Sequence, residues 1–133
     1  MIDAPAVSVI LPFYNASATL ERAVSSIVKQ SFTDWELLLI DDGSTDTGYE
    51  LAQKRAAADQ HIRLIRNDSN CGIVFSLNKG IDNAKAGLLA RMDADDWSHP
   101  ERLEKQVRYL QQHPETGLVS CGVKHEGSPS QKG

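Results

Sequence analysis

The apolar residues of this chain follow two alternating patterns. Short unbroken apolar runs are typical of buried strands, whereas apolar residues spaced three or four apart are typical of helices with one buried face. The apolar runs predict strands at residues 7–11, 35–40, 62–66, 88–92 and 118–123. The helical spacing predicts helices at residues 20–30, 47–58, 74–86 and 101–113. Strands that alternate with helices predict an α/β fold of the doubly wound type, in which a mainly parallel sheet carries helices on both faces.

Residues at the ends of these segments indicate where the elements begin and stop. Pro12 follows the first apolar run and is expected to end that strand. Thr47 is followed three residues later by Glu50, which is the spacing of a capping box. Ser98 and Glu101 repeat this spacing before the last predicted helix. We therefore expect side-chain caps at the starts of the second and fourth helices.

Length and composition indicate one soluble domain. The chain has 133 residues, of which 41% are hydrophobic and 24% are charged, and this suffices for one core. We expect residues 1–125 to form the domain, and residues 126–133, which have linker composition, to be a flexible tail or a truncated continuation. The net charge of −4 argues against sequence-independent binding of nucleic acid, which requires a basic surface.

The cysteines and the N-terminus bear on the cellular setting. Cys71 and Cys121 stand apart, without a CxxC pair or a histidine at metal-ligand spacing, so the sequence predicts neither a zinc site nor a disulfide framework. We expect a reduced, cytoplasmic setting. The sequence shows no signal-peptide pattern and no apolar stretch of about 18 residues. A longer parent protein could still lie at the inner face of the membrane.

Three segments rich in polar and aromatic residues each follow an expected strand, and these are residues 12–15, 41–46 and 93–98. The carboxyl ends of parallel strands meet at one edge of a sheet, where ligands bind. Tyr14 could stack on a nucleotide base or pack on the first helix. Asp42 could accept hydrogen bonds from a base or a ribose, or it could cap its own turn. Asn15 is expected to be a turn residue. Gly43 to Thr45 resemble a phosphate-binding loop only weakly, because the Walker lysine is missing.

The most acidic of these segments contains Asp93, Asp95 and Asp96. Two carboxylates one residue apart can share a hard cation such as Mn²⁺ or Mg²⁺, whereas without a cation their like charges would be crowded. A calcium-binding EF-hand loop is excluded because Trp97 stands where an oxygen ligand is needed. A phosphatase of the haloacid dehalogenase type is disfavoured because the motif follows the fourth strand instead of the first. Arg91 is expected to face the acidic run as a counter-charge or to contact a substrate.

Taken in order, several blocks of sequence resemble the family 2 nucleotide-sugar glycosyltransferases. The main blocks are residues 7–15, 39–46 and 90–96, and the match is extended by residues 78–81, 84–87 and 100–106. The resemblance covers about residues 6–123. It implies the A-type glycosyltransferase fold and a sugar donor activated as a nucleoside diphosphate, most often uridine diphosphate.

The same resemblance implies roles for individual residues. It places the nucleotide at Pro12, Tyr14, Asp42, Asn70 and Asp93. Asp93 and Asp95 match the Asp-x-Asp motif of the family, so that Asp95, together with Asp93, would hold Mn²⁺ or Mg²⁺ on the diphosphate. Asp96 adjoins this site. The partners implied are a nucleotide-sugar donor and a glycan or lipid-linked acceptor, in cell-surface polysaccharide or lipid-linked glycan assembly.

The mechanism usual in the family is inversion, in which a carboxylate takes a proton from the acceptor hydroxyl. The family places this general base in an acceptor-binding part beyond the Asp-x-Asp motif, and no residue of this chain matches it, so no catalytic residue is assigned. Two alternatives stay open, a nucleotide-sugar-binding module without turnover and an acidic interaction domain without a ligand. We also expect an exposed apolar surface, through which the chain could form a homo-oligomer, and the full-length protein could associate peripherally with a membrane.

Overall fold

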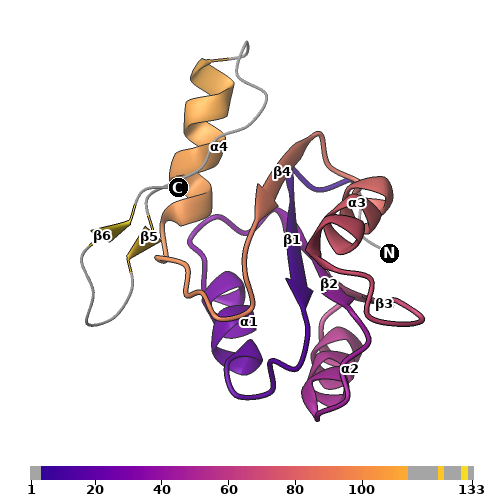
Figure 1. Ribbon diagram of the computed structural model, residues 1–133. Helices are drawn as coiled ribbons and strands as arrows, with labels where there is room; N and C mark the ends of the chain where they lie inside the picture. Colours follow the sequence, from indigo (N-terminus) through magenta and orange to yellow (C-terminus); the bar gives the residue numbers. More distant parts are fainter. Residues whose placement is uncertain (1–3, 114–122, 125–129, 132–133) are drawn as a thin grey trace.

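Figure 1 shows the computed structural model, which describes residues 4–113, 123–124 and 130–131. Strands and helices alternate along most of the described chain. In order, they are β1 (Val7–Phe13), α1 (Leu20–Val28), β2 (Trp35–Asp41), α2 (Gly48–Ala58), β3 (Ile62–Arg66), α3 (Ile73–Asn83), β4 (Leu88–Arg91), α4 (Arg102–Gln112), β5 (Val123–Lys124) and β6 (Ser130–Gln131). The predicted elements up to the fourth helix are therefore present.

The first four strands form one parallel sheet in the order β3-β2-β1-β4. The chain starts at β1, runs outward through β2 to β3, and then crosses back to place β4 on the other side of β1. The predicted α/β architecture with a parallel sheet is confirmed. β5 and β6 form a separate antiparallel pair. Of the strand predicted at 118–123, only Val123 lies within the described residues.

Helices cover both faces of the sheet, as predicted. On one face, α1, α2 and α4 pack through Val24, Ala52 and Leu103 onto alternate strand residues such as Leu11 and Leu37. On the other face, α3 packs through Leu77 onto a smaller cluster that contains Ile10, Leu38 and Ile40. The helices of the outward connections share one face and the helix of the return connection lies on the other, as right-handed crossovers require. The apolar positions on both faces of β1 and β2 explain their unbroken apolar sequence.

The approach of α3 to the sheet depends on Gly80. This residue faces Ile10, and a Cβ atom added to it would lie 2.5 Å from Ile10 Cγ2. Such a distance is too short for a carbon pair, so a larger residue would push α3 off β1. Because α3 begins beside the carboxyl ends of the strands, its position also matters for the site described below.

Pro12 does not end the first strand, contrary to the prediction. β1 continues through Pro12 to Phe13. The carbonyl of Ile10 accepts the Met92 N–H, and the carbonyl of Phe13 accepts the Asp42 N–H, so alternate residues of β1 face β4 and β2. Pro12 shares the orientation of Ile10 and faces β4, but β4 pairs with β1 only as far as Ile10. No neighbouring strand needs the missing N–H, and a proline is tolerated there.

Both predicted capping boxes are wrong. The residues before α2 and α4 are Thr47 and Glu101, and neither makes a side-chain cap. Asp46 serves the start of α2, because its carboxylate accepts the Gly48 N–H at 2.9 Å. Ser98 instead donates its backbone N–H to the Ser26 hydroxyl at 3.0 Å. The tertiary contact with α1 therefore replaces the local cap that the spacing indicated.

Candidate functional site

The predicted ligand edge lies at the carboxyl ends of β1, β2 and β4. The direction of strand progression reverses between β1 and β4, so the loops that follow these two strands separate and leave a crevice, which is where open α/β sheets bind ligands. β1 pairs with both β2 and β4. The loop after β1, which carries Tyr14, therefore starts between the loop that carries Asp42 and the acidic loop after β4.

A cavity of about 150 Å³ opens beside the end of β1. Its lining consists of Pro12, Phe13, Tyr14, Asp42, Ile73 and Ser76. Tyr14 is 47% exposed, so its ring is not buried in the core. An aromatic ring, an aliphatic side chain and a carboxylate around one small cavity suit a flat heterocycle that carries an N–H group. Three of the residues predicted for the nucleotide, Pro12, Tyr14 and Asp42, are therefore brought together.

Asp42 holds the loop between β3 and α3. Its Oδ1 accepts the Cys71 N–H at 2.7 Å and the Asn67 side-chain amide at 2.9 Å, and its Oδ2 accepts the Gly72 N–H at 3.0 Å. Burial alone would raise the pKa of Asp42, but these donors outweigh it and lower the pKa below its ordinary value. Asp42 is thus an ionised acceptor, and a carboxylate has acceptor capacity beyond three bonds.

The alternative of a simple turn cap applies to the neighbouring residue. Asp41 Oδ1 accepts the Ser44 N–H at 2.9 Å and so caps the turn after β2. Asp41 is fully buried, and Arg66 Nε lies 3.2 Å from its Oδ2. The two adjacent aspartates therefore have different roles. Asp41 caps its own turn, and Asp42 lines the cavity and bonds the next loop.

Sequence reasoning missed two residues that support Asp42. Asn67 is 1% exposed and donates its amide to Asp42 and, at 2.9 Å, to the Ser76 hydroxyl. Ser76 is fully buried and lies in α3. Because an ionised Asp42 can only accept, the orientation of the Asn67 amide is fixed. The polar residue types were visible in the sequence, but nothing in it indicated that they meet across the loop.

Asn70, the remaining residue predicted for the nucleotide outside the acidic run, is exposed in this loop. It does not line the cavity around Asp42. Its backbone nitrogen would lie 3.1 Å from a Cβ added to Gly43, whose φ of +80° favours glycine. The contact of Asn70 with a nucleotide stays a prediction.

Asn15 links the loops after β1 and β2. It adopts a φ of +49°, a left-handed conformation that asparagine tolerates. Its side-chain oxygen accepts the backbone N–H groups of Thr45 at 2.8 Å and Asp46 at 3.3 Å. A phosphate held by a backbone loop needs such N–H groups free. Asn15 is thus a turn residue as predicted, and it occupies the donors that would make the segment after Gly43 a phosphate cradle.

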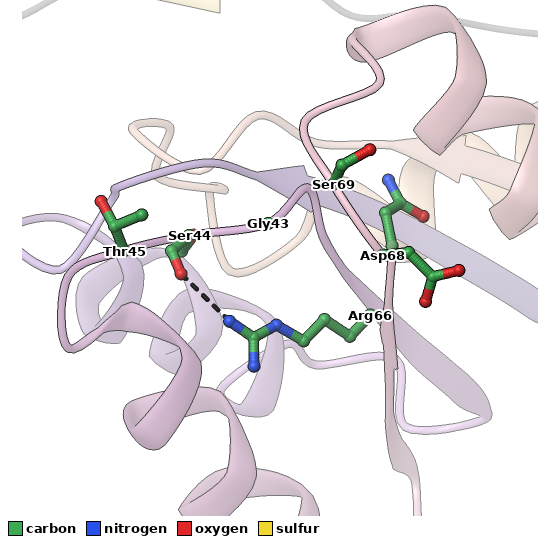
Figure 2. Close-up of a pocket in the computed structure, with 7 residues that line it drawn as sticks. Gly43, Ser44, Thr45, Arg66, Asp68 and Ser69 are labelled. Atoms are coloured by element: carbon green, nitrogen blue, oxygen red, sulfur yellow. Dashed lines mark hydrogen bonds between the residues drawn. The ribbon is translucent and has the colours of Figure 1, made fainter.

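A second, larger cavity of about 370 Å³ lies between the loops after β2 and β3, and it is shown in Figure 2. Arg66 points across it and donates to the Ser44 carbonyl at 3.1 Å. The same guanidinium approaches Asp41 and lies 4.0 Å from the centre of the Tyr49 ring. The positive charge in this cavity is therefore already compensated by protein groups.

The acidic loop after β4 gathers its three carboxylates. Oxygens of Asp93, Asp95 and Asp96 lie within 4.8 Å of one another, which fits a hard divalent cation that prefers carboxylate oxygen. Arg91 is exposed, and its guanidinium lies 3.3 Å from the carboxylate of Asp93. The predicted counter-charge role of Arg91 is confirmed.

The pKa of Asp96 is raised from its ordinary value. Burial raises the pKa of Asp96, and the charges of Asp93 and Asp95 raise it further, against the opposing Asp93 N–H and the charge of Arg102. Asp93 donates that N–H to Asp96 at 3.2 Å. A bound cation would offset both the burial of Asp96 and the repulsion between the carboxylates. The third carboxylate was assigned no definite role from the sequence, although its position next to Asp95 placed it beside the pair.

Comparison with known proteins assigns the chain to a class. Residues 8–133 match the family model of glycosyl transferase family 2. The chain therefore belongs to this family, and the resemblance of its motifs is confirmed. EpsE of Bacillus subtilis (strain 168), which is named a glycosyltransferase, is 42% identical over 124 residues, covering 92% of this chain and 45% of EpsE. The chain thus spans less than half the length of this relative.

Solved structures show the same fold. The 1–349 portion of S. aureus TarS, in complex with UDP-GlcNAc, superposes with a TM-score of 0.76 at 24% identity, covering 82% of this chain and 32% of that one. The mannosyltransferase PcManGT from Pyrobaculum calidifontis, in complex with GDP-Man and Mn²⁺, superposes with a TM-score of 0.74 at 25% identity, covering 81% and 33%. Both therefore share the fold of this chain.

None of the helices among the described residues has the length and apolar character that crossing a bilayer requires.

Proposed function

We propose that this chain is the donor-binding part of a metal-dependent, inverting glycosyltransferase that transfers a sugar from a nucleoside diphosphate, UDP in the first instance, to a glycan or lipid-linked acceptor. One observation carries the proposal. The cavity with Tyr14 and ionised Asp42 and the cluster of three carboxylates lie at the ends of strands that flank and include β1. A nucleoside diphosphate has a base at one end and a pair of phosphates at the other, and this site offers chemistry for both.

The base is bound by residues at the ends of β1 and β2. The exposed ring of Tyr14 offers a stacking face, which contributes on the order of 1–3 kcal/mol in proteins that stack single bases. Asp42, already ionised and fixed by the loop that Asn67 begins, accepts a ring N–H of the base. Uracil has such a donor at N3. Guanine also carries a ring N–H, and PcManGT is named with GDP-Man, so the choice of base is a separate arm of the test.

The diphosphate is bound through the acidic loop. Asp95 and Asp93, with Asp96 beside them, would hold Mn²⁺ or Mg²⁺ between the carboxylates and the phosphate oxygens. When bound, the metal would neutralise the charge that develops on the leaving diphosphate. This Lewis-acid effect lowers the energy of the transition state by roughly several kcal/mol. The naming of PcManGT with Mn²⁺ and the approach of the three carboxylates within 4.8 Å of one another both support a cation here. The role of general base in the inversion is assigned to no residue.

Calorimetric titration tests the proposal. The chain is titrated with UDP in the presence and absence of Mn²⁺, and the same titrations are made on Asp95→Asn. Asp82→Asn is the matched control. Asp82 is exposed near the C-terminal end of α3, whereas the loop held by Asp42 meets the N-terminal end of this helix at Gly72. We expect Mn²⁺ to tighten UDP binding to the wild type and to the control but not to Asp95→Asn. An affinity for UDP that is the same with and without Mn²⁺ in every variant would exclude the metal site.

Two further arms separate base choice and turnover. GDP is titrated in place of UDP, and tighter binding of GDP would replace the uridine assignment while keeping the rest. Release of UDP from UDP-sugars, with and without candidate acceptors, then separates an enzyme from a module that binds the donor without turnover. Absence of binding to both nucleotides would favour an acidic domain without this ligand.

A further inference from the structure

The acidic loop between β4 and α4 is fixed at both of its ends. At the first end, Met92 is 1% exposed and donates its N–H to the Ile10 carbonyl at 3.0 Å. At the second, buried Ser98 donates its N–H to the Ser26 hydroxyl of α1 at 3.0 Å, and Figure 1 shows the loop passing beside α1. The carboxylates stand on the segment between these anchors, where Asp95 is exposed.

One side chain from the next helix joins the two ends. Arg102, the first residue of α4, donates through Nη2 to the Arg91 carbonyl at 2.6 Å and through Nη1 to the Ser98 hydroxyl at 2.9 Å. The two acceptors lie on opposite sides of the acidic segment in the sequence. A guanidinium suits this bridge because its donors have a fixed, planar spacing, whereas an ammonium is a single point.

We propose that Arg102 is a positioning residue that holds the acidic loop closed, so that Asp93, Asp95 and Asp96 converge on one cation. This inference rests on the proposed metal site. Arg102 itself bonds a backbone carbonyl and a hydroxyl, and it acts on the cation only through the geometry of the loop. Its Nε is buried and has no hydrogen-bond partner among the described residues.

The charge of Arg102 predicts an opposite effect, which makes the inference testable. Its positive charge acts on Asp96, and a cation near a metal site repels the metal. If Arg102 acted by charge alone, its replacement with methionine would strengthen binding of Mn²⁺ and its replacement with lysine would change nothing. If it acts by bridging the loop, both Arg102→Met and Arg102→Lys weaken binding, because methionine has no donor and the single lysine nitrogen cannot occupy the positions of both Nη1 and Nη2.

Binding of Mn²⁺ to the chain is measured by the loss of the free-ion signal in electron paramagnetic resonance. We expect at least a tenfold weaker affinity in Arg102→Met and in Arg102→Lys, in the range found when groups that orient metal ligands are removed, about 10–100-fold. The control is Arg108→Met, which removes an exposed arginine of the same helix that pairs with Glu104 among the described residues. Its Mn²⁺ affinity should stay within about twofold of that of the wild type. UDP binding without metal should be unchanged in all variants.

Amide hydrogen exchange gives a readout that needs no metal. Residues 92–98 should exchange faster in both Arg102 variants, with unchanged exchange in β1 and β2. Unchanged exchange in this segment overturns the inference, as does wild-type or tighter Mn²⁺ affinity in the Arg102 variants. If Arg102→Met fails to fold, Arg102→Lys gives the same comparison. If the wild type binds no Mn²⁺, the proposed metal site fails, and the hydrogen exchange still decides whether Arg102 closes the loop.

Discussion

Glu36 is a buried charge at the amino end of the sheet, and replacing it with glutamine should strongly destabilise the fold. Its side chain is fully buried on β2. Oε2 accepts the Ser8 hydroxyl at 2.6 Å and the Lys85 N–H at 2.7 Å, and Oε1 accepts two donors of Arg63 at 3.0 and 3.2 Å. This carboxylate thus joins β1, β2, β3 and the connection from α3 to β4.

The magnitude follows from the donors that glutamine would leave without an acceptor. A glutamine amide has one oxygen, so its NH₂ group would face the Arg63 guanidinium or else the hydroxyl and N–H of Ser8 and Lys85. Breaking a buried ion pair costs about 3–5 kcal/mol. Arg63 is 32% exposed, which places Glu36→Gln at the lower end, about 3 kcal/mol. This loss is a large part of the 5–15 kcal/mol that typically stabilises a domain.

Urea denaturation at several pH values measures the effect. Burial alone would raise the pKa of Glu36, but the bonds from Ser8, Lys85 and Arg63 outweigh it and lower the pKa. A lowered pKa in the folded state means that the stabilisation is present in full above the pKa of the unfolded chain, which is about 4.3 for glutamate. It is lost as the pH falls through the folded pKa. The difference between wild type and Glu36→Gln should therefore be constant at neutral pH and shrink in acid.

Glu21→Gln is the control for this prediction. Glu21 pairs with Arg55 at the surface and is 53% exposed, so its loss should cost less than about 1 kcal/mol. If Glu36→Gln cost no more than this control at neutral pH, the argument that the buried carboxylate organises the amino end of the sheet would be refuted. A difference that grew in acid would contradict the sign of the pKa shift.

Two further predictions concern α3 and the acidic loop. Gly80→Ala would place a methyl group 2.5 Å from Ile10 Cγ2 and should lower the free energy of unfolding, measured with urea, by about 1–3 kcal/mol. The control is Gly87→Ala, because nothing lies within 4 Å of its new Cβ. Equal stability of the two variants would count against the close approach of α3. Arg91→Ala removes an exposed cation that pairs with Asp93 and should tighten Mn²⁺ binding about two- to fivefold by calorimetry. Weaker binding of Mn²⁺ would mean that Arg91 orients the Asp93 carboxylate toward the metal.

The elements could be predicted from the sequence because their signals are local. The unbroken apolar runs of β1 and β2 and the helical spacing of α1 reflect burial of each segment by itself. The order of the strands could not be predicted, because it depends on packing between distant segments. The tolerance of Pro12 inside β1 follows from that order, since only the shortness of β4 leaves its missing N–H without consequence.

The site was predictable only in part, for the same reason. Asp42, Asp93 and Asp95 follow strands directly, and their residue types indicate a ligand edge. The contacts that fix them come from residues far along the chain. Asn67 reaches Asp42 across 25 positions, and Arg102 reaches back 11 positions to the Arg91 carbonyl. A capping-box spacing gave Ser98 a local role, but the fold uses it to anchor the acidic loop to α1 and to Arg102.

The two parts of the candidate site, the cavity at Asp42 and the cluster of Asp93, Asp95 and Asp96, differ in how far protein groups already compensate their charges. Asp42 is ionised and accepts three hydrogen bonds, so its position is fixed before any ligand arrives. The pKa of Asp96 is raised, first by burial and then by the charges of Asp93 and Asp95. Under the proposed function, a neutral base would meet a preformed surface, whereas a charged diphosphate would meet a cluster that a cation stabilises. Asp42 follows β2 and the carboxylates follow β4, with β1 between these two strands. We therefore expect that binding of the base and binding of the metal can be weakened independently by substitution.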